Sequence, residues 1–174
     1  MDNEKYTKDD AYHTLDLINS WINNVDAKTS FALAFVAALI GFVFVNGSPD
    51  VFSEISGVDK VTTCMVVKAI VVLGLYIASF LSIMFMFLAI KARTQNTSGK
   101  ESVMFFGTIA SMDLNDFKSK TMNMDKKELT KDLLEQVHTN SEICTKKMKF
   151  YNAGIFWLII ATALCFGAVV FNII

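Results

Sequence analysis

The sequence predicts an all-helical membrane protein with three transmembrane helices, the first and third of which extend into a cytoplasmic helical layer. Its 174 residues are 53% hydrophobic and only 19% charged, which is more apolar and less charged than an ordinary soluble domain. The apolar residues are concentrated in three continuous runs, 31–45, 61–90 and 150–174. A transmembrane helix needs roughly 20 apolar residues, whereas membrane strands alternate in polarity, so these runs indicate helices.

The N-terminal segment, 1–30, is predicted to be a cytoplasmic amphipathic helix that runs into the first span, 29–46. Thr7 can cap this helix, and Asp9 and Asp10 suit its first turn. The apolar stripe then recurs every three or four positions: Tyr12, Leu15, Ile18 or Asn19, Ile22 and Val25. Because polar residues precede the first apolar run, we expect a retained signal anchor rather than a cleaved signal peptide.

The other spans follow from the turn signals and the polar stretches. Residues 46–49, Asn-Gly-Ser-Pro, contain the only proline and should end the first span, leaving 47–60 as a short external loop. The second span is predicted over 61–91 and the third over 150–174. Between them, 92–149 should form a long cytoplasmic segment.

The cytoplasmic segment should contain a short helix after an apolar run. Residues 103–110 are apolar and are expected to pack under the cytoplasmic helices or against the membrane face. Ser111 with Asp113 then predicts the start of a helix over roughly 112–122.

A long stalk helix is predicted to start near residue 126 and to continue into the third span. Asp125 followed by Glu128 resembles a capping box. Its apolar stripe has a period of about 3.7 residues, nearer to eleven residues in three turns than to seven in two. The stripe comprises Leu129, Leu133, Val137, Asn140 or Ser141, Cys144, Met148 and Tyr151.

The distribution of Lys and Arg predicts the orientation. Three lie in 1–30, one lies in the loop 46–60, and eleven lie in 91–149. Cytoplasmic segments carry the excess of Lys and Arg, so the N-terminus and 92–149 should be cytoplasmic, and the loop and the C-terminus outside.

No catalytic constellation is found in the sequence. The two histidines, His13 and His138, lie in no metal-ligand spacing, and no Gly-rich phosphate loop or nucleophile motif occurs. Cys64, Cys144 and Cys165 are expected to be free thiols. We therefore predict a protein that is not an enzyme, with no catalytic residues, no bound metal and no resident cofactor.

A basic cluster at one membrane level offers a candidate anion site. It consists of Lys91, Arg93, Lys146, Lys147 and Lys149. Two or three of these cations could hold a phosphate, and nearby aromatic residues could stack on a base. Anchoring by the positive-inside rule explains the same cluster without any ligand.

Small residues recur at four-residue spacing in every span and predict helix packing faces, within or between protomers. They are Ala34 and Ala38, Ala37 and Gly41, Gly74 and Ala78, and Ala163 and Gly167. Lys68, inside the second span, either snorkels to the outer surface or lines a pore. The candidate packing or pore positions are Gly41, Lys68, Gly74, Ala78 and Gly167. Three helices enclose no wide path, so a pore would need several chains.

Several motifs together resemble the Pycsar transmembrane effector family. Ile18-Asn19-Ser20-Trp21-Ile22 and Asp26-Ala27-Lys28-Thr29-Ser30 precede the first span. Phe105-Phe106-Gly107-Thr108-Ile109-Ala110 lies in the cytoplasmic segment, and Gln136, Asn140-Ser141 and 143–147 precede the third span. Their order, their spacing and the number of spans agree over roughly residues 15–160.

The resemblance implies an antiphage effector in the bacterial inner membrane, paired with a nucleotide cyclase or synthase. It would sense a cyclic nucleotide, with a pyrimidine cyclic mononucleotide favoured over the cyclic oligonucleotides of related systems. It would then impair the membrane as a homo-oligomer, in an abortive infection response, without binding nucleic acid. The expected ligand-binding residues are Lys28, Arg93, Phe105, Phe106, Lys146 and Lys147. The alternative is a non-enzymatic scaffold or accessory subunit that binds a partner protein through its stalk.

Overall fold

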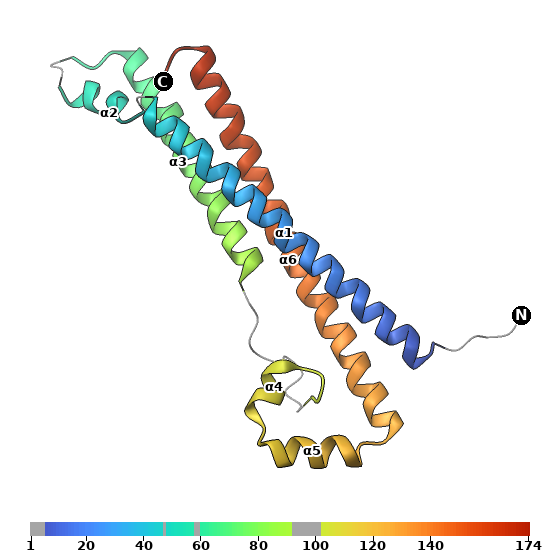
Figure 1. The fold of residues 1–174 in the computed structure, drawn as a ribbon. Helices are drawn as coiled ribbons and strands as arrows, with labels where there is room; N and C mark the ends of the chain where they lie inside the picture. The colour runs from blue at the N-terminus through green and yellow to red at the C-terminus, as the bar shows by residue number, and fades with distance from the viewer. Residues whose placement is uncertain (1–5, 47, 58–59, 92–101) are drawn as a thin grey trace, which may run out of the picture. The chain divides into compact units, whose positions relative to one another are not determined.

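The computed structural model describes residues 6–46, 48–57, 60–91 and 102–174, and within them the chain is helical with no strand (Figure 1). The helices are α1 (Lys8–Val45), α2 (Ser48–Ser56), α3 (Thr63–Ile90), α4 (Phe106–Ser111), α5 (Leu114–Asn123) and α6 (Lys126–Val170). Three of them, α1, α3 and α6, are long and apolar enough to cross a membrane. The predicted fold class is therefore confirmed.

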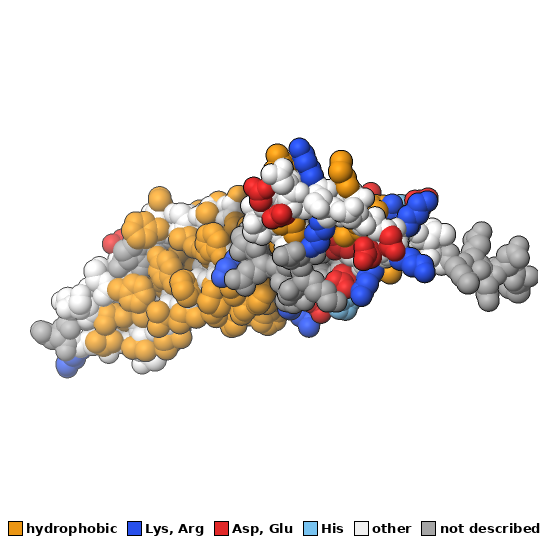
Figure 2. All heavy atoms as spheres, turned by 90° about the horizontal axis from the view of Figure 1, so that it is seen from below, with side chains coloured by type: hydrophobic (Ala, Val, Ile, Leu, Met, Phe, Trp, Pro, Cys, Tyr) orange, Lys and Arg blue, Asp and Glu red, His pale blue; other side chains and the backbone are white. Residues whose placement is uncertain are grey.

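The chain divides into two compact units. We call 1–24 with 91–147 the polar unit, and 25–90 with 148–174 the span unit; α1 and α6 contribute residues to both. Figure 2 shows apolar side chains over the visible surface of the span unit and acidic and basic side chains gathered on the polar unit. Each unit is thus suited to a different solvent.

The span unit is held together by two apolar clusters, each of which draws residues from α1, α3 and α6. The first cluster contains Leu39, Val43, Leu75, Ala78, Ala161 and Cys165, and the second contains Ala32, Val36, Met86 and Leu158. Large aromatic residues face outward, with Phe31 79% and Phe80 66% exposed. Outward-facing aromatic and aliphatic side chains are expected where lipid rather than water is the solvent.

Helices α3 and α6 approach each other closely at Gly154. The Ser82 hydroxyl donates to the Gly154 carbonyl at 2.9 Å. A Cβ on Gly154 would lie 2.8 Å from Met86 Cγ and 3.3 Å from the Ser82 carbonyl oxygen. Only glycine therefore fits at this position without movement of a neighbour.

The predicted helix starts at Thr7 and Asp125 are confirmed. The Thr7 backbone N–H donates to the Asp10 carboxylate at 2.8 Å, and the Asp10 N–H donates back to the Thr7 hydroxyl at 3.2 Å. At the start of α6, the Glu128 N–H donates to the Asp125 carboxylate at 2.7 Å, and the Asp125 N–H donates to the Glu128 carboxylate at 3.3 Å. α6 then continues without interruption to Val170, as predicted.

Two segments differ from their prediction. The region 47–60, predicted as a loop, contains the helix α2. Pro49 lies in the first turn of α2, where its missing N–H would have no helical acceptor. The proline that was expected only to end the first span therefore suits the start of α2. The apolar run 103–110 contains α4, which ends at Ser111. Ser111 therefore does not start the next helix: α5 starts at Leu114, and Asp113 caps it by accepting from the Asn115 N–H at 2.9 Å.

The predicted stripe on α6 was right at Leu133 and Cys144, which are buried, but wrong at Met148, which is 44% exposed. Gln136 and Thr139 are buried instead, at 4% and 7% exposure. The fully buried positions Ala161 and Ala168, with Leu133 and Gly154, are spaced in multiples of seven residues. These positions follow the seven-residue repeat of a left-handed coiled coil, whereas Leu133 and Cys144 are eleven residues apart, as in the predicted stripe, and Gln136 and Thr139 lie off the seven-residue repeat.

Candidate functional site

Ser102, which is 3% exposed, accepts three hydrogen bonds in the polar unit. Its hydroxyl oxygen accepts from the Met104 N–H at 3.0 Å, from the Phe105 N–H at 3.2 Å and from the Gln136 side-chain amide at 3.1 Å. The adjacent Val103 N–H donates to the Asp132 carboxylate at 2.9 Å. Two side chains of α6 therefore fix the backbone that leads into α4.

A second polar contact joins α1 to α6 within the polar unit. The Asn140 side-chain amide donates to the Asn19 side-chain oxygen at 3.0 Å. Both side chains are half-buried. An isolated polar pair in a helix–helix seam adds little stability but specifies the register, because an amide without a partner is costly to bury.

The predicted aromatic pair lies directly after the Ser102 contacts. The ring centroids of Phe105 and Phe106 are 4.8 Å apart and the rings are tilted by 49°. Phe105 is the residue that precedes α4 and is half-buried, whereas Phe106 is 64% exposed. An exposed aromatic ring on a fixed backbone is a suitable surface for stacking a nucleobase.

The predicted cations are distributed differently. Lys146 is exposed and Lys147 is half-buried, both on the part of α6 that belongs to the polar unit. They follow Gln136 by ten and eleven residues, which is about 15 Å along a helix. A ligand that uses both the aromatic pair and these lysines must bridge much of that rise or take cations from a second protomer. Lys28 belongs to the span unit, and Arg93 lies outside the described residues.

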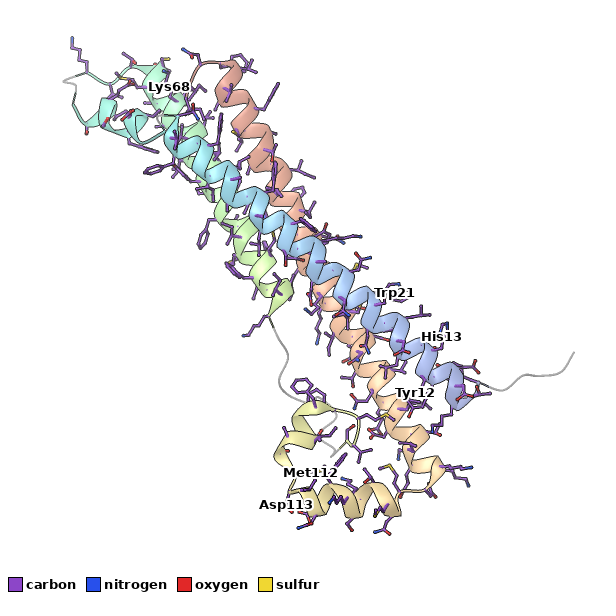
Figure 3. The ribbon with its side chains drawn as sticks, in the orientation of Figure 1. Tyr12, His13, Trp21, Lys68, Met112 and Asp113 are labelled. Atoms are coloured by element: carbon purple, nitrogen blue, oxygen red, sulfur yellow. The ribbon has the colours of Figure 1, made fainter. Side chains whose placement is uncertain are left out.

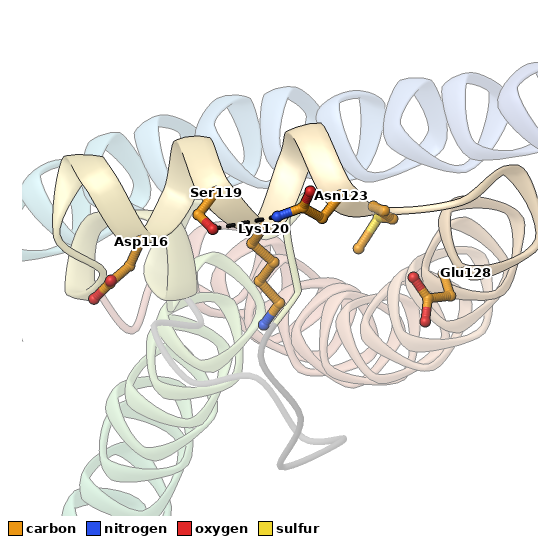
Figure 4. Close-up of a pocket in the computed structure, with 6 residues that line it drawn as sticks. Asp116, Ser119, Lys120, Asn123 and Glu128 are labelled. Atoms are coloured by element: carbon orange, nitrogen blue, oxygen red, sulfur yellow. Dashed lines mark hydrogen bonds between the residues drawn. The ribbon is translucent and has the colours of Figure 1, made fainter.

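A cavity that the sequence did not indicate lies between α5 and the start of α6 (Figure 4). Its volume is about 440 Å³, and its lining consists of Asp116, Ser119, Lys120, Asn123, Met124 and Glu128. In it, the Asn123 amide donates to the Ser119 hydroxyl at 3.4 Å. Two carboxylates against one lysine disfavour an anionic ligand, so this cavity is a poor site for a cyclic phosphate.

The predicted membrane positions divide into two groups. Gly74 and Ala78 pack inside the span unit: Ala78 is 1% exposed, and a Cβ on Gly74 would touch Leu164 at 3.6 Å. Gly41 and Gly167 have open space where a Cβ would stand. Lys68 lies in the second turn of α3 and is half-buried (Figure 3).

Few of the described side chains are candidates for a reactive thiol or a metal ligand. The three cysteines are free, with Cys64 exposed and Cys144 and Cys165 buried. Burial raises the pKa of the Cys144 thiol, and the charge of Lys147 opposes this rise. Among the described residues, no group of three His, Cys, Asp or Glu side chains is placed to hold a metal ion.

These features define a class of protein, a small three-span helical membrane protein with an attached polar helical unit. A family model described as Pycsar effector protein domain matches residues 10–174. The Pycsar effector protein GmPycTM of Gulbenkiania mobilis is 33% identical over 175 residues, which cover 91% of this chain and 89% of that protein. The chain therefore belongs to the Pycsar transmembrane effector family. No solved structure matches it.

Membership in this family makes the chain an antiphage defence effector that works with a cyclase system and is associated with a membrane. Three polar residues of the motifs that resemble this family have a structural role. Asn19, Gln136 and Asn140 each make a hydrogen bond between separate segments of the polar unit. These motif residues therefore hold the unit together, whereas other motif residues, among them Trp21, Phe106 and Lys146, are exposed.

Proposed function

We propose that the protein binds a cyclic nucleotide through its polar unit, with a pyrimidine cyclic mononucleotide favoured, and then impairs the bacterial inner membrane as a homo-oligomer. The observation that carries the proposal is the family match over residues 10–174, which includes both units. The excess of Lys and Arg in 91–149 supports a cytoplasmic polar unit, with the C-terminus outside. Such a membrane response would end the infection by stopping the growth of the host cell.

The ligand site is proposed around the aromatic pair and the lysines of α6. Phe106 offers an exposed ring for the base, and Lys146 and Lys147 offer charge for the cyclic phosphate. The rise of about 15 Å between Gln136 and Lys146 favours a site completed by a second protomer. The ligand must bind the active assembly more tightly than the resting one, because equal affinity shifts no equilibrium.

The membrane response is proposed to use the open faces of α1 and α6. Gly41 and Gly167 leave room for the backbone of another helix, and close approach through small residues is the usual basis of helix association in lipid. Lys68 would then lie near the outer end of an assembled path. Association of several protomers is required because three helices enclose no wide path.

The first test is the thermal stability of the full-length protein in detergent against cyclic mono-, di- and trinucleotides. A ligand at 100 times its dissociation constant stabilises a protein by about 2.7 kcal/mol if it binds only the folded form. We expect a rise in the unfolding temperature with one pyrimidine cyclic mononucleotide. The same ligand should release a trapped dye from liposomes that contain the protein.

A charge-matched pair of variants tests the site. The double variant Lys146→Ala, Lys147→Ala should lose the stabilisation by the ligand. The double variant Lys126→Ala, Lys127→Ala removes the same charge from exposed positions of the same helix and should keep it. A wild-type protein that responds to no cyclic nucleotide would overturn the proposed function, and an equal response of both variants would overturn the role of Lys146 and Lys147.

A further inference from the structure

The backbone that leads to the aromatic pair is fixed by hydrogen bonds at three consecutive residues. The N–H groups of 103, 104 and 105 all donate to side-chain oxygens, the first to Asp132 and the other two to Ser102. The Gln136 amide donates to the same Ser102 hydroxyl. Residue 106, the exposed aromatic residue, follows directly as the first residue of α4.

Attaching a segment to a helix through buried hydrogen bonds carries a free-energy cost whenever one of the bonds is not made. Ser102 and Gln136 are 3% and 4% exposed, and a buried polar group without its partner costs more than a well-made hydrogen bond contributes. Apolar contacts would attach the segment without that risk. Hydrogen bonds instead specify one geometry, which is what a binding surface requires of the residues that support it.

We infer that Ser102, Asp132 and Gln136 are positioning residues of the ligand site. They fix the backbone of 103–105 relative to α6, so that a base stacked on Phe106 is connected to α6 through two side chains. Displacement of the aromatic pair by the ligand then acts on Asp132 and Gln136, which lie one helical turn apart. This inference rests on the proposed function, because it assigns the support of the same site.

The first arm of the test needs no ligand. Hydrogen exchange of the full-length protein in detergent reports the protection of the amides of 103–105. We expect at least about fivefold faster exchange in Ser102→Ala, which leaves two N–H groups without an acceptor, and in Gln136→Leu, which removes the hydrogen bond between Ser102 and α6. Ser119→Ala, at an exposed serine of α5, is the control and should not change this segment. Unchanged exchange in both variants would overturn the inference.

The second arm uses Asp132 and measures binding of cyclic UMP and cyclic CMP by calorimetry. Asp132→Asn keeps a side-chain oxygen that can accept from the Val103 N–H, whereas Asp132→Ala removes it. We expect Asp132→Ala and Gln136→Leu to weaken binding about tenfold and Asp132→Asn to bind within about twofold of wild type. The double variant of Ser102→Ala and Gln136→Leu should bind no more weakly than Ser102→Ala alone, because Ser102→Ala already removes the contact with Gln136.

The two arms separate the possible failures. If wild type binds a nucleotide and Asp132→Ala binds it equally well, the positioning role is wrong and the proposed function stands. If wild type binds neither nucleotide while exchange is faster in the variants, the contacts are real, but the positioning role fails together with the proposed preference for a pyrimidine cyclic mononucleotide. A purely structural role would lower the unfolding temperature of Asp132→Ala without any change in its affinity for the nucleotide.

Discussion

Gly154 gives the sharpest test of the packing in the span unit. In Gly154→Ala the new Cβ would stand 2.8 Å from Met86 Cγ and 3.3 Å from the Ser82 carbonyl oxygen. Overpacking of this kind costs about 1–3 kcal/mol, and weakening of the Ser82 hydrogen bond adds about 1 kcal/mol. Alanine gains about 1 kcal/mol of helix propensity over glycine. The net expectation is a destabilisation of about 1–3 kcal/mol, from the clash and the hydrogen bond less the propensity gain.

The assay is thermal unfolding of the full-length protein in detergent. For a chain of this length, 1 kcal/mol corresponds to about 2–4 °C, so Gly154→Ala should unfold several degrees below wild type. Gly167→Ala is the matched control, since a Cβ at this position of the same helix meets no atom within 4 Å. In Met86→Ala the nearest contact atom is absent, so adding Gly154→Ala to it should cost less than adding it to wild type. Equal stability of Gly154→Ala and Gly167→Ala would refute the close approach.

Three further predictions concern two helix starts of the polar unit and the reactivity of the cysteines in both units. Asp125→Ala should speed amide exchange in the first turn of α6, because two backbone N–H groups lose their acceptor at a cost of about 1 kcal/mol. The Thr7 hydroxyl and N–H lower the pKa of Asp10 in the folded protein. The amide protection of the first turn of α1 should therefore be complete above the ordinary Asp pKa and should be lost as the pH falls through the lowered pKa of Asp10. Amide hydrogen exchange measured as a function of pH checks this. In detergent at neutral pH, a maleimide should label Cys64 well before Cys144, because Cys144 is buried and its thiol pKa is raised; mass spectrometry of labelled peptides checks this.

The spans and the helix starts were predictable because their signals are local. A capping box needs only Asp125 and Glu128, three residues apart, and a membrane span needs only a long apolar run. The seam of α6 was not predictable in the same way. Its buried positions include Gln136 and Gly154, which an apolar stripe leaves out, so following the apolar residues alone placed the stripe at the exposed Met148.

The candidate site was predictable only in part, for a related reason. Phe105 and Phe106 are conspicuous in the sequence as aromatic residues in a polar segment, and the structure presents Phe106 to solvent. The residues that hold the aromatic pair are ordinary polar residues, and Ser102 precedes Asp132 and Gln136 by 30 or more positions. Contacts over such separations depend on the path of the chain between them and leave no periodic signal.

Two helix–helix hydrogen bonds made by α6 show how its register is specified. Asn140 donates to Asn19 in the polar unit, and Gly154 accepts from Ser82 in the span unit. These two residues are 14 positions apart, which is two repeats of the seven-residue seam, so both occupy the same seam position. A rotation of α6 by one residue would bury polar groups without partners in both units. Apolar burial therefore supplies most of the stability of α6, and its polar contacts select a single register.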